Sequence, residues 1–212
     1  MAMNGRIGRV VAPIVMCLLL ATFIGGSRAA NPTDPDWPCI QPKVPQISAG
    51  QVWNGPSIEE IGESWRDDAT ISELAAKLAA RRTTIEEAKT LIAEFAAASE
   101  GDRAQRLTAV FAGTLSLINS ERASIIAGIG RYARRQKALS KKIEEEMAEL
   151  SRMPQDDSPD SVSMRADLQE VQAWDIRIFQ ERERSLRYVC EQPVVLEQRV
   201  FAIAREILSH LK

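Results

Sequence analysis

Three cysteines are the most reactive side chains in this chain of 212 residues. Cys17 lies in an apolar N-terminal segment, whereas Cys39 and Cys190 lie outside it, far apart in the sequence. If the N-terminal segment is removed on export, two cysteines remain. An even number of cysteines in an exported chain favours a disulfide, so we predict a bridge between Cys39 and Cys190. Two buried free thiols, or a bridge between chains, are the alternatives. No CxxC motif is present, which argues against a thioredoxin-type redox site.

The N-terminal segment is typical of a secretory signal peptide. Arg6 and Arg9 precede the apolar run VVAPIVMCLLLATFI, and the small residues of SRA follow it. This run is too short for a comfortable transmembrane span, so we predict cleavage of residues 1–29 and a periplasmic or secreted protein. An uncleaved membrane anchor is the alternative; a membrane span in the mature chain is not expected.

The sequence contains few residues that could support other kinds of catalysis. The single histidine, His210, lies two residues from the C-terminus, where a catalytic base or metal ligand is seldom held in place. A Ser/His/Asp triad and a histidine-rich metal cluster therefore lack residues, and GxGxxG, P-loop and HExxH motifs are absent from the sequence. We expect a protein that is not an enzyme and that needs no cofactor.

Two acidic groups could bind a cation or act as paired catalytic carboxylates. Four oxygen-bearing side chains have roughly the spacing of a calcium loop: Asp156, Ser158, Asp160 and Asp167. The position of the loop glycine holds Ser161, and the last ligand is not glutamate, so we favour a helix-capping role for Ser161 or Ser163. A second group comprises Glu59, Glu60, Glu63, Asp67 and Asp68. Paired carboxylates can cleave glycosides, but acids near helix starts are more simply dipole partners on a solvated surface.

A basic stretch is the candidate partner-binding face. It contains Arg131, Arg134, Arg135, Lys137, Lys141 and Lys142. The alternative is a solvated helix face that the acidic segment EEEMAE at 144–149 balances. Without its signal peptide the chain loses three basic residues and no acidic one, so its net charge changes from −2 to about −5. Nucleic-acid binding is therefore not expected.

The segment 30–56 is rich in proline, which forbids a long helix. It also carries Trp37, Trp53 and Cys39, residues that a disordered tail seldom needs. We predict an ordered strap that lies across a helical body.

Residues 57–212 are expected to form a single all-α domain. Capping-box patterns begin at Ser57, at Thr70 and at Thr83 or Thr84, and they predict a small head of helices near 58–65, 71–81 and 85–98. Two longer arms follow, at 103–152 and 163–211, separated by a segment with Pro154 and Pro159. Their nearly equal lengths and heptad-spaced apolar residues predict a long, coiled-coil-like antiparallel hairpin. Arg122, Gln136 and Glu146 interrupt the heptads.

A hairpin tip near residue 157 sets the expected register. It places the basic stretch opposite residues 172–183, which include Asp175, Glu181 and Glu183. It also places Cys190 and Pro193 opposite residues 121–124. Because proline cannot donate a helix hydrogen bond, we expect a kink or a restart at Pro193, with 194–211 as a separate segment.

These features favour an exported interaction protein whose partner is another protein: a periplasmic adaptor, a chaperone-like factor or an envelope assembly component. The sequence leaves a homodimer open. The alternative function is a periplasmic ligand-binding or sensory helical bundle, with a pocket lined by Trp53, Trp65 and Phe111.

Overall fold

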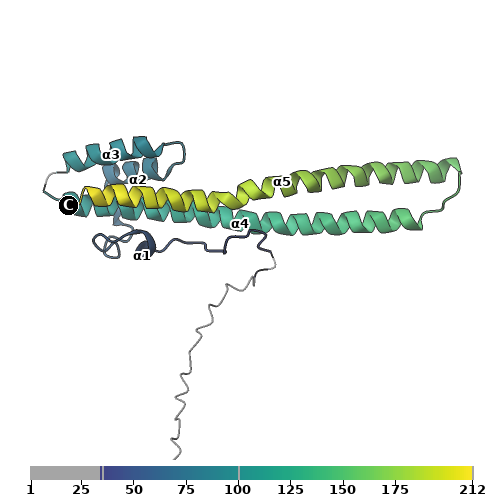
Figure 1. Ribbon diagram of the computed structural model, residues 1–212, viewed down its shortest axis with the longest axis horizontal. Helices are drawn as coiled ribbons and strands as arrows, with labels where there is room; N and C mark the ends of the chain where they lie inside the picture. Colours follow the sequence, from purple (N-terminus) through teal and green to yellow (C-terminus); the bar gives the residue numbers. More distant parts are fainter. Residues whose placement is uncertain (1–33, 35, 100, 212) are drawn as a thin grey trace, which may run out of the picture. The chain divides into compact units, whose positions relative to one another are not determined.

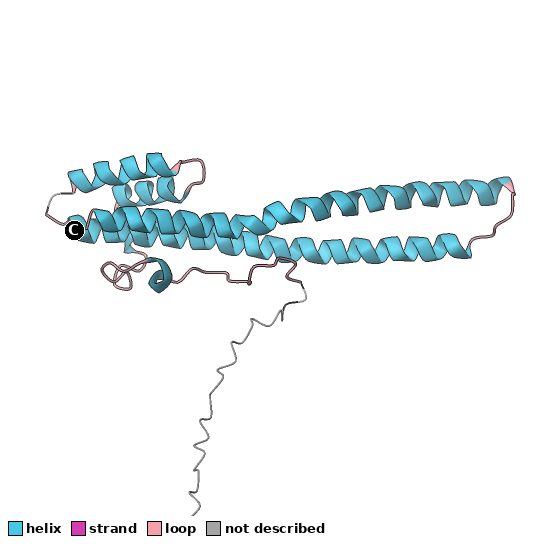
Figure 2. Ribbon diagram, in the orientation of Figure 1, coloured by secondary structure: helices cyan, strands magenta, loops and turns pink. Residues whose placement is uncertain are grey.

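The described part of the protein is entirely helical apart from loops. The computed structural model describes residues 34, 36–99 and 101–211, and its regular elements are all helices (Figure 2). The predicted signal peptide, residues 1–29, lies outside the described residues. The predicted all-α class is confirmed. Within the described ranges, no helix combines the length and apolar character that crossing a membrane requires.

Two long antiparallel helices dominate the fold. Helix α4 spans Arg103–Arg152 and helix α5 spans Pro159–Ser209, and the two lie side by side (Figure 1). This confirms the predicted hairpin, including both bounds of its first arm. The second arm begins earlier than position 163, because Ser158 caps the helix by accepting a hydrogen bond from the Ser161 N–H group. Pro159 occupies the first turn, where the missing N–H of proline costs nothing.

The register of the hairpin agrees with a tip near residue 157. The Tyr132 hydroxyl donates a hydrogen bond to the Arg182 carbonyl at 2.6 Å. Nearer the tip, Lys142 pairs with Asp175, an acid in the stretch predicted to face the basic residues. Each contact joins positions equidistant, within about one helical turn, from the tip.

Two shorter helices form the head. Helix α3 spans Ile85–Ala98, as predicted, and its Thr84 cap accepts a hydrogen bond from the Glu87 N–H group. Helix α2 spans Ala69–Ala79, two residues earlier than predicted, because Asp68 rather than Thr70 is its cap. The Asp68 carboxylate accepts hydrogen bonds from the N–H groups of Thr70 and Ile71, which lie in the first turn and have no partner within the helix.

The predicted helix at 58–65 is wrong. Turns occupy this segment, followed by the short 3₁₀ helix η1 at Ser64–Arg66. The Ser57 hydroxyl accepts a hydrogen bond from the Glu59 N–H group, which closes a local turn in place of a capping box. Gly62 then adopts a φ of +49°, in the left-handed region, and this conformation is incompatible with a continuous right-handed helix.

The core lies where the head packs on the hairpin. Helices α2 and α3 contact the end of α4 and α5 that carries the C-terminus (Figure 1). The rings of Trp53 and Phe111 stack there with centroids 4.1 Å apart, and Trp65 is only 3% exposed. The alternative function would need these three rings to line a pocket; they belong to the packed core.

The strap runs along α4, mostly extended, with one short helix, α1, at Ala49–Val52 (Figure 1). The side chain of Asn119 fastens it by two hydrogen bonds. Its oxygen accepts from the Ile47 N–H at 2.8 Å, and its nitrogen donates to the Ile47 carbonyl at 3.0 Å. A neutral amide thus satisfies both polar groups of one strap residue.

Helix α5 continues through Pro193. The predicted separate segment 194–211 is therefore wrong, although α5 changes direction along its length (Figure 1). Pro193 is buried, and the neighbouring Cys190 and Leu196 are buried too. Packing on both sides of the proline keeps the helical path despite the missing backbone hydrogen bond.

Candidate interaction site

The predicted disulfide is present. Cys39 and Cys190 are bridged with their Cα atoms 5.6 Å apart, across a sequence separation of 151 residues. The bridge joins the strap to α5, and Cys190 is buried at 8% exposure. We call the region where the strap, α4 and α5 meet around this bridge the joint.

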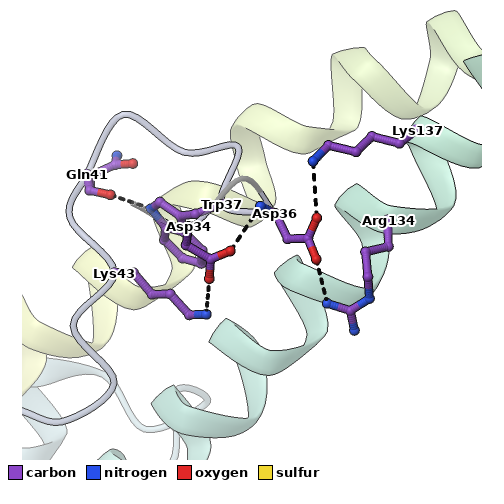
Figure 3. Close-up of polar contacts among 7 residues, drawn as sticks. All are labelled: Asp34, Asp36, Trp37, Gln41, Lys43, Arg134 and Lys137. Carbon is purple, nitrogen blue, oxygen red and sulfur yellow. Dashed lines mark hydrogen bonds and ion pairs between the residues drawn. The ribbon is translucent and has the colours of Figure 1, made fainter. Parts of the chain in front are cut away.

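The strap also binds the basic stretch of α4. One oxygen of Asp36 lies 3.2 Å from Arg134 and the other lies 3.1 Å from Lys137 (Figure 3). Hydrogen bonds from Lys137 and Arg134 hold the pKa of the Asp36 carboxyl below its ordinary value. Two of the six predicted partner-binding residues therefore have a partner inside the chain.

The other four basic residues differ among themselves. Lys142 bridges Asp175 and Glu146, and Lys141 lies 3.4 Å from Glu145. Arg131 and Arg135 are exposed and form no ion pair with any residue that the structure describes. The partner-binding role of this stretch stays a prediction, and the two arginines are its accessible part.

Local contacts shape the strap before it reaches α4. The Trp37 indole N–H donates to the Gln41 carbonyl at 2.6 Å, and Asp34 pairs with Lys43 (Figure 3). A hydrogen bond from Lys43 lowers the pKa of Asp34. These contacts hold the loop around Trp37 in the shape that presents Asp36 to α4 and Cys39 to α5.

Arg122 lies at the centre of the joint, although the sequence marked it only as a break in the heptads. It is 5% exposed. Its Nε donates to the Val44 carbonyl at 2.9 Å, and its Nη1 donates to the Pro193 carbonyl. Its Nη2 lies 3.6 Å from Glu197 Oε2. Burial lowers the pKa of Arg122, whereas the Glu197 charge opposes that shift.

The part of the hairpin beyond the joint, residues 134–189, has a different character, and we call it the distal hairpin. Only two of its residues are buried, Glu146 and Asp175, and both are acids. Large apolar side chains are exposed instead: Met147, Val162, Met164, Val171, Trp174 and Tyr188.

Three of these exposed side chains share one face of α5. Met164, Val171 and Trp174 are spaced by seven and three residues, which places them on one side of a helix. Trp174 and Met164 are each 60% exposed. The Arg177 guanidinium lies 6.0 Å from the centre of the Trp174 ring. We call Met164, Val171 and Trp174 the apolar stripe.

The remaining candidates have structural roles. At the tip, Asp156 accepts hydrogen bonds from Ser158, the residue that caps α5, so the predicted caps Ser161 and Ser163 are wrong. Among the described residues, no three acids, histidines or cysteines are grouped so that they could hold a metal ion.

The described contacts of the acidic group at 59–68 and of His210 are also structural. Asp68 caps α2 and lies 3.3 Å from Arg106, and Glu63 pairs with Arg66. His210 lies 3.2 Å from Glu206 on the preceding turn. These contacts are those of helix ends and surface pairs.

Comparison with known protein families, with curated proteins and with solved structures finds no match to this chain. Sequence reasoning missed Asp36, Gln41 and Asn119 at the joint. The role of Arg122 could have been inferred from the sequence. The predicted register already placed this arginine opposite Pro193 and close to Cys190.

Proposed function

We propose that this is an exported, non-enzymatic protein that binds another protein through its distal hairpin. It would act as a periplasmic adaptor, a chaperone-like factor or an envelope assembly component. The observation that carries the proposal is the exposure of Trp174, at 60%, within the apolar stripe.

Exposure of the apolar stripe to water is unfavourable. Scattered apolar residues are normal on a surface, but contiguous exposed ones are typical of interaction sites. Tryptophan and arginine are also the residues that most often dominate the binding free energy of protein interfaces. The stripe ends in a tryptophan, Trp174, and Arg177 lies beside that ring. A partner with an apolar patch would remove this surface from water.

The two accessible arginines, Arg135 at the start of the distal hairpin and Arg131 just before it, add a basic surface on α4. Arg131 and Arg135 are one helical turn apart and exposed, so both can contact the same partner. We expect that partner to carry acidic side chains next to its apolar patch. Because exposed charges act mainly on the rate of association, their contribution should fall as salt rises.

The disulfide supports an exported location. Such bridges persist in oxidising compartments and are rare in the cytosol. The signal peptide predicted at residues 1–29 would deliver the chain there.

Site-specific photo-crosslinking tests the proposal. A photoreactive amino acid replaces Val171 in the full chain, expressed in the cells that carry its gene. Glu73, exposed on α2 of the head, is the control position. We expect a discrete adduct from position 171 and none from position 73.

A second substitution separates specific from incidental contacts. Trp174→Ala should abolish the adduct at position 171 while the protein stays folded. An adduct that survives this change, or equal labelling from position 73, would rule out the distal hairpin as the binding face. An adduct of twice the chain mass would identify the partner as a second copy.

A further inference from the structure

We propose that the joint is a binding site for a small molecule with an apolar body and a carboxylate. A cavity of about 310 Å³ lies there between the strap, α4 and α5. Known small-molecule sites begin at about 300 Å³, so a compact ligand fits this space. The proposal is independent of the function assigned to the distal hairpin.

The walls of the cavity are mainly apolar. Trp37 and Val44 of the strap face Ile126 of α4 and Val194 of α5. Four polar side chains also line it: Arg122, Gln41, Gln51 and Glu197. An apolar chamber with a few placed polar groups is the usual composition of a ligand site. The single cation among those groups selects for an anionic head.

Arg122 has donor capacity left for that head. A guanidinium carries five N–H donors, and the strap and α5 carbonyls take one each from Nε and Nη1. The Nη2 atom is 3.6 Å from Glu197, longer than a hydrogen bond. A carboxylate of the ligand can therefore take up the Nη1 and Nη2 donors that remain. The Glu197 side chain is 45% exposed, so it can turn to solvent when the ligand enters.

Gln41 supplies a second polar group. Its Oε1 is buried and accepts no hydrogen bond from any described residue. An unsatisfied buried amide oxygen costs free energy until it finds a donor. Rotating the terminal amide by half a turn exchanges its oxygen and nitrogen, and the nitrogen can then donate to a carboxylate.

Holding the strap against α4 does not require the positive charge of Arg122. Asn119 fastens the same strap at Ile47 with a neutral side chain and two hydrogen bonds. An arginine makes a comparable bond to Val44 but brings a charge into the interior, which is unfavourable unless an anion compensates it. A ligand carboxylate would complete that compensation, which Glu197 provides only at a distance.

Ligand binding and strap docking are coupled at this site. Half of the lining residues belong to the strap: Trp37, Gln41, Pro42, Val44, Ile47 and Gln51. The site therefore exists only while the strap is docked, and a ligand that binds it must stabilise the docked strap. Cys190 also lines the cavity, so reduction of the disulfide reports on strap release.

The test uses the full oxidised chain with hexanoate as the probe, and with 1-hexanol and hexylamine as matched controls. The rate of Cys39–Cys190 reduction by dithiothreitol is followed by trapping the free thiols. At ten times its dissociation constant, hexanoate should slow reduction about tenfold, because only the ligand-free strap opens. Equal protection by 1-hexanol, or none by hexanoate up to tens of millimolar, would overturn the proposal.

Variants separate the cavity from the fastening. Ile126→Trp, and as a second version Val194→Phe, fills the cavity while leaving the hydrogen bonds of Asn119 and Arg122 in place, so protection by hexanoate should disappear. Asn119→Ala loosens the strap without filling the cavity, so it should raise the basal reduction rate yet keep the hexanoate effect. Unchanged protection in a folded cavity-filling variant would place the hexanoate elsewhere and refute the site.

Discussion

The same two helices meet two very different environments along their length. Near the C-terminus, α4 and α5 pack with α2, α3 and the strap, and they bury Phe111, Ile118, Leu196 and Ile203 almost completely. In the distal hairpin they pack mainly against each other, with the strap reaching them through Asp36 at Arg134 and Lys137. The two buried side chains there, Glu146 and Asp175, are acids.

The contrast shows that different interactions stabilise the two halves of the same pair of helices. The proximal half is held by apolar burial, the main favourable contribution to folding. The distal half is held by partial burial and by polar contacts such as Gln136 to the Phe179 carbonyl, which fix the register but contribute little net free energy. The distal hairpin can thus give its apolar surface to a partner without disturbing the core.

The largest expected effect tests this contrast directly. Phe111→Ala should lower the free energy of unfolding by about 4 kcal/mol, because it empties a fully buried position that stacks on Trp53. The matched change Trp174→Ala should alter it by less than about 0.5 kcal/mol. Urea denaturation measures both. Similar losses for the two aromatic residues would mean that the distal hairpin is as much part of the core as the head.

The disulfide lies at the boundary between the two halves. Cys39→Ser and Cys190→Ser should each lower the free energy of unfolding by about 3 kcal/mol, less than the roughly 5 kcal/mol of the chain-entropy estimate. The double variant should be no worse than either single one, since one bridge is lost in each case. Thermal denaturation under non-reducing conditions decides this, and additive losses would contradict it. Hydrogen exchange should rise in the strap and not near the tip.

A smaller change should make the distal half resemble the proximal half. Glu146→Leu replaces a buried carboxylate, whose Oε2 lacks a hydrogen bond, with an apolar side chain. Lys142 keeps its contact with Asp175. We expect a stabilisation of about 1 kcal/mol, measured as slower amide exchange near residues 140–150 and 170–180. Glu146→Gln is the control, and faster exchange in the leucine variant would show that the charge is needed.

The smallest effect concerns the strap and pH. The pKa of Asp36 is lowered by hydrogen bonds from Lys137 and Arg134. A carboxyl with a lowered pKa in the folded state stabilises that state above its unfolded pKa, and this contribution is lost as pH falls through the folded pKa. Asp36→Asn should therefore lower Tm by about 1 °C at pH 6, and by progressively less as pH falls below the ordinary range of an aspartate pKa. A difference that does not shrink as pH falls would exclude the ion pairs as its cause.

Long-range periodicity was enough to predict the hairpin. The absence of proline from 103 to 152 and the heptad spacing gave the bounds of α4, and the equal lengths of the arms gave the register that Tyr132 and Lys142 confirm. The disulfide followed from the cysteine count. The inferences about the two arms rest on patterns that repeat many times, so no single residue could overturn them.

Local motifs were less reliable, because neighbours compete for the same role. Asp68 took the cap that Thr70 was expected to provide, and the left-handed Gly62 ended any helix that Ser57 could have begun. Pro193 was accommodated because packing on both sides outweighed one lost hydrogen bond. The disulfide and the register located the joint, but its polar contacts could not be found from the residues alone. Its contacts span more than 70 positions, as between Arg122 and Val44, and only the folded hairpin brings them together.

The bridge between Cys39 and Cys190 also acts as a check on the pairing of the arms. A disulfide requires Cα atoms within about 7 Å, and a slip of α5 along α4 by one turn would move Cys190 by about 5.4 Å. Because the strap is fastened to α4 at Asn119, a slipped α5 would carry its cysteine out of reach. Oxidation therefore leaves a covalent record, in each molecule, that its two arms found the right alignment.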